Sequence, residues 1–141
     1  MRDTQTKDAQ LIKTIYLAAT PEKVWDYLTR AEHLAKWYHA AAADLGAGAD
    51  YQLNNTDGEK IVWGTVLEWE PPKRLVTTFE AGPLGGGETT VAWDLEPLEG
   101  GTFVTLTHSG VLAIGDHGPR TLHAIDAGWD GHVGRLRDAV K

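Results

Sequence analysis

A histidine and a serine stand next to each other in the segment Thr107-His108-Ser109-Gly110, and these are the residue types of a base and a nucleophile. Adjacent residues of a strand point to opposite faces of a sheet, so the two side chains do not meet if this segment is extended. The sequence also contains no Gly-x-Ser-x-Gly turn, which exposes the nucleophile of many hydrolases. We therefore predict no catalytic residue here.

His108 is nevertheless the polar side chain that we expect to touch a ligand. It follows Val104 and Leu106 at two-residue spacing, so the three side chains share one face of the predicted strand. Because the other two are apolar, we expect this face to point inward. An inward histidine can be a ligand contact or a hydrogen-bonded core residue, and both roles fit the pattern.

A second set of polar side chains near the C-terminus includes potential metal ligands: His117, His123, Asp126, Asp130 and His132. These positions lie off the apolar stripe of the helix expected there, which predicts a solvated helix face. The chain has no Cys, and it has no His-Glu-x-x-His or acidic calcium-loop pattern. The sequence predicts neither a metal site nor a cofactor.

Large aromatic side chains alternate with other residues along three predicted strands. The alternating sets are Trp63, Thr65, Leu67 and Trp69; Leu75, Thr77 and Phe79; and Val91, Trp93 and Leu95. Such faces pack as core under a helix, but one helix does not completely fill a strongly bent sheet, and the remainder is a cavity suited to small molecules. The candidate ligand-binding residues are Trp37, Tyr38, Trp63, Phe79, Trp93, His108 and Trp129.

Two short helices are expected after a first strand at Leu11–Ala18. Thr20 can accept hydrogen bonds from the free amides of a helix start, and Pro21 fits the first helical position. Apolar residues then recur at three- and four-residue spacing as far as Tyr38, with a break near Thr29. Each helix therefore has one apolar stripe.

Beyond the helices, the sequence predicts a series of antiparallel strands. Ala40–Asp50 is expected to be a connection, and Asp57-Gly58 and Pro71-Pro72 are expected to end strands. The expected strands are Tyr51–Asn54, Lys60–Glu70, Arg74–Glu80, Glu88–Glu96 and Thr102–Ser109.

Pro119 is predicted to open a final helix with a long apolar stripe. The stripe consists of Leu122, Ile125, Trp129, Val133, Leu136 and Val140, and it needs a broad apolar partner. Strands that do not alternate with helices form an antiparallel sheet, so the fold class is α+β, with about six strands. Gly128, Gly131 and Gly134 weaken this helix, and we expect a bend or partial unwinding near Gly128.

Length and charge narrow the function classes. The 141 residues fit a single domain spanning 1–141, with residues 1–8 expected to be a flexible tail. No apolar run is long enough for a signal peptide or a membrane span, so we expect a cytoplasmic protein. The formal net charge of −7, with scattered basic residues, argues against nucleic acid and anionic membranes as partners.

Four segments together resemble a known superfamily: Thr20–Leu28, His33–Tyr38, Glu70–Leu75 and Gly128-Trp129. The chain resembles the SRPBCC superfamily of START and Bet v 1-like domains, and most closely its branch related to the C-terminal domain of the activator of the heat-shock protein 90 ATPase. The resemblance implies a helix-grip fold, in which a curved antiparallel sheet and a long C-terminal helix enclose one cavity.

Two departures from that pattern bear on the cavity. Trp37-Tyr38 stands where many members have Trp-Trp or Trp-Phe, which adds a hydroxyl at the pocket mouth. Gly131 and Val133 stand where longer side chains are usual, which suggests extra space beside the last helix.

We interpret the sequence as a binding protein that holds an apolar or aromatic small molecule, such as a lipid, polyketide or natural product, without chemistry. One alternative is a polyketide cyclase or aromatase-like enzyme using His108, Tyr38 and Asp94. Another is a co-chaperone-like interaction domain with a chaperone partner. The sequence gives this alternative no further support, because it shows no additional chaperone-binding domain. The protein is expected to be a monomer or a weak homodimer.

Overall fold

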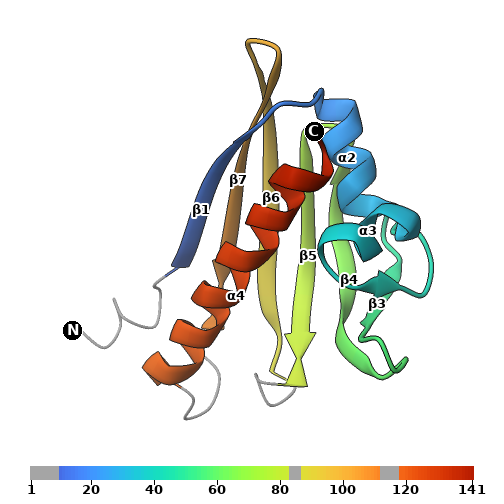
Figure 1. Cartoon of the computed structure of the whole chain (residues 1–141). Helices are drawn as coiled ribbons and strands as arrows, with labels where there is room; N and C mark the ends of the chain where they lie inside the picture. The colour runs from blue at the N-terminus through green and yellow to red at the C-terminus, as the bar shows by residue number, and fades with distance from the viewer. Residues whose placement is uncertain (1–9, 83–86, 112–117) are drawn as a thin grey trace.

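The computed structural model describes residues 10–82, 87–111 and 118–141 of the chain. They form a seven-stranded antiparallel sheet in the order β1-β7-β6-β5-β4-β3-β2, with α4 lying across one face (Figure 1). The elements are β1 (Gln10–Leu17), α2 (Pro21–Thr29), α3 (Ala31–Trp37), β2 (Ala40–Ala41), β3 (Asp50–Asn54), β4 (Lys60–Glu70), β5 (Arg74–Ala81), β6 (Thr89–Leu98), β7 (Gly101–Ser109) and α4 (Gly118–Ala139).

The predicted α+β helix-grip architecture is confirmed. One strand was missed, because Ala40 and Ala41, which we expected in a connection, pair with Asn54 and Leu53 of β3. Two alanines have little strand propensity of their own, so the pairing depends on the neighbouring strand. The expected tail at residues 1–8 lies outside the described residues.

The start of α2 follows its sequence signal. The backbone N–H of Lys23 donates to Thr20 Oγ1 at 3.2 Å, and Pro21 occupies the first turn. The stripe predicted for α3 is buried at Leu34 and Trp37, and the helix ends at Tyr38, where the backbone leaves helical geometry. This end turns the chain so that Tyr38 and His39 lie beside α4, with ring contacts to Trp129 and His132.

Helix α4 places its apolar stripe against the sheet as predicted. Trp129, Leu136 and Val140 are buried, and the stripe residues Leu122, Ile125 and Val133 are half-buried against the same core. The helix runs without interruption from Gly118 to Ala139, so the expected unwinding near Gly128 does not occur. No helix of the described residues is long and apolar enough to cross a membrane.

A salt-bridge cluster joins α4 to the first strand. Lys13 Nζ contacts carboxylate oxygens of Asp126 and Asp130, the latter at 2.8 Å. The two carboxylates raise the pKa of Lys13, mainly through hydrogen bonds. Both acidic side chains of this helix segment therefore share one lysine on the β1 side, and the cluster keeps one net negative charge.

An irregularity in β4 overturns one predicted face. Trp63, Thr65, Leu67 and Trp69 do not share a side, because the register with β5 shifts between Val66 and Glu68. Such a bulge adds one residue to a strand and reverses the alternation beyond it. Val62 and Val66 are buried, Trp63 lies on the outer face against Lys60 Nζ at 4.4 Å, and Trp69 packs on Trp25.

The close approach of β4 to β5 at Gly64 gives a stability prediction. A Cβ at Gly64 would overlap the Thr78 carbonyl oxygen and lie 2.6 Å from Thr78 Oγ1. That carbonyl accepts the Tyr51 hydroxyl at 2.6 Å, and Thr78 Oγ1 accepts the Thr65 N–H. We expect Gly64→Ala to lower the free energy of unfolding by about 2 kcal/mol, the usual cost of forcing atoms into a packed site.

Urea denaturation measures this change, and Gly82→Ala is the control. A Cβ at Gly82 meets nothing within 4 Å, so this variant should stay within about 0.5 kcal/mol of the parent. Equal stability of the two variants would contradict the tight contact at Gly64.

Candidate functional site

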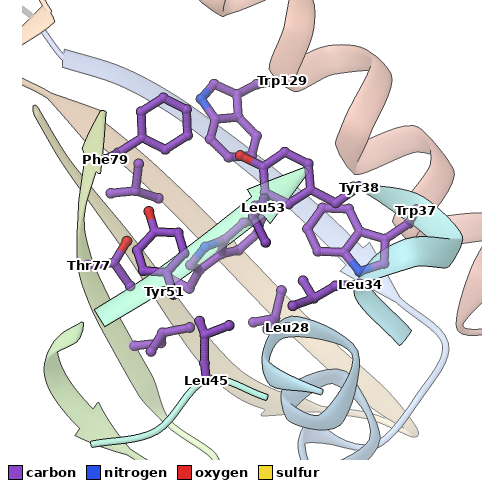
Figure 2. A pocket seen from close by; sticks show the side chains of 13 residues that line it. Leu28, Leu34, Trp37, Tyr38, Leu45, Tyr51, Leu53, Thr77, Phe79 and Trp129 are labelled. Atoms are coloured by element: carbon purple, nitrogen blue, oxygen red, sulfur yellow. The ribbon is translucent and has the colours of Figure 1, made fainter. Parts of the chain in front are cut away.

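The interior between the sheet and the helices contains a small apolar cavity (Figure 2). Its free volume is about 30 Å³, far below the roughly 300 Å³ of the smallest ligand pockets. Side chains therefore fill most of the space beneath the helices. The lining residues are Leu28, Leu34, Trp37, Tyr38, Leu45, Tyr51, Leu53, Leu75, Thr77, Phe79, Val91, Trp93 and Trp129.

A larger groove of about 290 Å³ opens between α4 and the strands β4 and β5. It is lined by Tyr38, His39, Ile61, Val62, Phe79, Ala81, Ala124, Ile125, Gly128, Trp129 and His132. Tyr38, Phe79 and Trp129 line both spaces, and Figure 2 shows them together at one end of the inner cavity, away from Leu28 and Leu45. These three rings separate the inner cavity from the groove.

Small residues on α4 keep this groove open. Ala124 and Gly128 lie four residues apart and therefore on one face of the helix. A Cβ at Gly128 would meet nothing within 4 Å, so there is empty space directly above the helix backbone. Gly128, which has a low helix propensity, therefore also leaves free volume beside the helix.

His108 holds a fully paired hydrogen-bond chain in the core. Trp129 Nε1 donates to its Nδ1 at 2.9 Å, and its Nε2 lies 2.8 Å from Thr89 Oγ1. Because indole N–H only donates, Nδ1 must accept, so Nε2 carries the hydrogen and donates to Thr89. The Thr89 hydroxyl then donates to the Phe79 carbonyl at 2.7 Å.

His108 points inward as predicted, but both its nitrogens serve the core. Burial lowers its pKa from 6.5 to about 4, so the imidazole is neutral at pH 7, as the accepting Nδ1 requires. Its side chain lines neither the inner cavity nor the groove. The structure thus places His108 behind Trp129, where it orients the indole that forms the groove floor.

Tyr38 is the polar group at the centre of the site. Burial, with a smaller contribution from Tyr51, raises the pKa of its phenol well above 10, so the hydroxyl keeps its proton. Its ring stacks on Trp37 at a centroid distance of 5.0 Å and meets Trp129 at 5.6 Å. Tyr38 therefore offers a neutral donor and acceptor between two indoles.

Two histidines at the groove were not among the predicted site residues. His39 and His132 lie with ring centroids 5.2 Å apart, and both rings contact Tyr38. The expected solvated face is wrong for His132, which is half-buried because the chain after α3 covers this part of α4. Only the pairing of α3 with α4 brings these two residues together, so local spacing gave no signal.

The remaining candidate residues divide between core and outer surface. Trp37 is buried, and its Nε1 donates to the Tyr27 carbonyl at 2.8 Å. Trp93 is buried edge-on against Trp37 and Trp129, and both Trp37 and Trp93 line the inner cavity. Trp63 lies outside this site, on the opposite face of the sheet, for the reason given by the β4 bulge.

The residues of the enzymatic alternative do not meet. Asp94 alternates with the buried Trp93 and Leu95, so it lies on the outer face, where it pairs with Arg74 at 2.5 Å. His108 is enclosed in the core, and Tyr38 lines the groove. Within residues 10–82, 87–111 and 118–141, no three His, Cys, Asp or Glu side chains are grouped to hold a metal ion, and His117 lies outside these ranges.

Comparison with known proteins identifies relatives of the whole fold. The family model described as activator of Hsp90 ATPase homolog 1-like protein matches residues 18–141. The comparison with curated proteins gives no match.

Solved structures share the architecture at low sequence identity. The CalU16 protein of Micromonospora echinospora aligns with a TM-score of 0.77 and 21% identity, over 94% of this chain and 76% of that chain. The Aha1 dimer of Colwellia psychrerythraea aligns at 0.76 and 23%, over 94% and 96%. An Hsp90 activator of Plasmodium falciparum, PFC0360w, aligns at 0.76 and 20%, over 90% and 92%.

Proposed function

This chain belongs to the family of activator of Hsp90 ATPase homolog 1-like proteins, and from the geometry of its groove we propose that it binds a small apolar or aromatic molecule between α4 and the sheet, without catalysing a reaction. The observation that carries the proposal is the groove itself. Its volume of about 290 Å³ is near the lower end of ligand pockets, and most of its lining is apolar.

The side chains around the groove suit binding better than catalysis. Tyr38 stays protonated, and the two groove histidines are neutral at pH 7 because burial lowers the pKa of each. His108, the strongest sequence candidate for a base, is fully engaged with Trp129 and Thr89. The polar groups can orient a ligand, and the apolar surface supplies affinity through burial.

Of the sequence candidates, Tyr38, Phe79 and Trp129 are the proposed contacts in the groove. Trp37 and Trp93 line the inner cavity, which shares Tyr38, Phe79 and Trp129 with the groove. We therefore propose the groove as the main site and the inner cavity as its extension.

A second candidate function is a protein-interaction role. Two of the structural neighbours are described as an Aha1 dimer and as an Hsp90 activator, which favours a chaperone or a second copy as partner. Ile12 and Tyr16 are 58% and 43% exposed on β1, which gives such a partner apolar surface away from the groove. The two functions use different faces and can be tested separately.

Blocking the groove tests the small-molecule proposal. We expect the uncharged fluorescent probe N-phenyl-1-naphthylamine to bind with a Kd below about 100 µM and to quench tryptophan fluorescence. Gly128→Leu puts a branched side chain into the empty space above the helix, and we expect it to weaken binding about tenfold or more, because ligand and side chain compete for the same volume. Fluorescence titration measures both.

Gly134→Leu is the matched control. It makes the same change on the same helix, at a position where a Cβ also meets nothing within 4 Å and which does not line the groove. The control should bind the probe like the parent. If the parent binds no tighter than about 1 mM, or if both leucine variants bind equally well, the groove is not the site and the protein-interaction role is favoured.

A further inference from the structure

Resting on the proposed binding function, we propose that the molecule held in the groove carries one anionic acid group, which binds beside His39 and His132 while its apolar part lies between α4 and the sheet. The polar side chains of the groove are gathered in one part of its lining. Its polar lining consists of the adjacent side chains Tyr38, His39 and His132, and its other lining residues are Trp129 and aliphatic or phenyl groups. A ligand that matches it has one polar end.

Arg135 fixes which nitrogen of His132 can donate. Arg135 Nη2 lies 2.6 Å from His132 Nδ1, and a guanidinium can only donate, so Nδ1 accepts and Nε2 carries the hydrogen. Arg135 is itself held by its Nε donating to the Trp37 carbonyl at 3.2 Å. We assign Arg135 as a positioning residue, which also places a positive charge directly behind the imidazole.

The charges facing the histidines favour an anion. From β4 and β5 the groove is faced by Ile61, Val62, Phe79 and Ala81, which do not titrate, and Tyr38 stays neutral. On α4 the nearby carboxylates of Asp126 and Asp130 are bound to Lys13 of β1. Among the described residues, the charged side chain beside these imidazoles is thus the cationic Arg135, which contacts His132 and acts on His39 through its charge. None of the described residues that line the groove is a carboxylate that would repel an acid group.

Protonation of the histidines links this binding to pH. Burial and the charge of Arg135 lower the pKa of His39, and burial, His39 and Arg135 lower that of His132 to about 4, opposed by the Trp37 carbonyl. A bound anion beside them favours the imidazolium and raises these pKa values. Binding of an anion therefore takes up protons and strengthens as pH falls, whereas binding of a neutral molecule does not.

A matched pair of probes separates the acid preference from binding itself. 8-Anilinonaphthalene-1-sulfonate and N-phenyl-1-naphthylamine differ by one sulfonate, which stays ionised at every pH used. We expect the sulfonate probe to bind about fivefold or more tightly at pH 5.5 than at pH 7.5, since uptake of one proton gives at most tenfold per pH unit. The uncharged probe should change by less than about twofold over the same range.

His132→Gln tests the assignment of the titrating group. Glutamine keeps an N–H donor but gains no proton, so the pH dependence of the sulfonate probe should fall to about half or less on a logarithmic scale. Binding of the uncharged probe to this variant should stay independent of pH, because it takes up no proton. Arg135→Met removes the charge that lowers the histidine pKa values, so the rise in affinity should begin at a higher pH. If Arg135 had a purely structural role, its removal would change the affinity for both probes equally. The pH at which affinity for the sulfonate probe begins to rise would then stay the same.

The outcomes are distinguishable. If the uncharged probe binds but the sulfonate probe shows no dependence on pH, or if His132→Gln keeps the full dependence, the acid preference is wrong and the binding function stands. If neither probe binds, the binding function is wrong. Gly128→Leu must weaken the sulfonate probe at pH 5.5 as well, and thermal unfolding at each pH must show a folded protein, because this dye also binds partly unfolded chains.

Discussion

Replacing Trp129 with alanine is expected to lower the free energy of unfolding by about 4 kcal/mol, within the range for large aromatic truncations in a core. The indole is only 3% exposed, and its ring meets those of Tyr38, Phe79 and Trp93. The variant also leaves Nδ1 of the buried His108 without its donor. Urea denaturation, with the slope compared to the parent, measures the loss.

Trp129→Phe separates the two contributions. Phenylalanine keeps an aromatic ring in the core but removes the indole N–H, so we expect about 1–2 kcal/mol of destabilisation from the unpaired His108 nitrogen and the smaller ring. A loss below about 1 kcal/mol for Trp129→Ala would contradict the core role of this side chain. Equal losses for both variants would mean that the hydrogen bond, and not packing, holds α4 here.

The second large effect is the dependence of stability on pH. The pKa of His108 falls from 6.5 to about 4 on folding because the imidazole is buried, so the unfolded chain binds more protons between these two values. The free energy of unfolding is therefore not reduced by this group above pH 6.5. It decreases as pH falls toward 4, by about 3 kcal/mol for this one group. His132 acts in the same direction, with a smaller effect because its side chain is partly exposed.

His108→Gln is the variant that tests this assignment. An amide can accept from Trp129 and donate to Thr89, so the variant should fold, but it cannot take up a proton. Urea denaturation at pH 7.0, 6.0, 5.0 and 4.5 should show a clearly shallower loss for the variant than for the parent. Parallel losses in the two proteins would mean that other groups cause the acid destabilisation.

Features encoded by neighbouring residues were predictable from the sequence. The Thr20-Pro21 cap, the stripe on α4 and the turn at Asp57-Gly58 involve residues close in the chain, and the structure has each of them where expected. The antiparallel α+β architecture follows from these elements, because the long apolar stripe of α4 requires a broad sheet as its partner.

The faces of β4 required knowledge of its neighbour. Alternation places Trp63 and Trp69 on one side, but one extra residue between Val66 and Glu68 reverses the second half of the strand. The bulge arises from pairing with β5, which the sequence of β4 alone does not specify. Trp63 therefore lies away from the groove, and no local sequence pattern indicates the reason.

The sequence by itself determined that His108 points inward and that Trp129 faces the sheet, because strand and helix periodicity fix the direction of a side chain. Only the tertiary structure decided their partners. His108 bonds to Trp129 and Thr89, and His39 meets His132, through contacts between residues far apart in the chain. Free volume in the groove is likewise decided by packing, since Gly128 leaves a space only where no other element fills it.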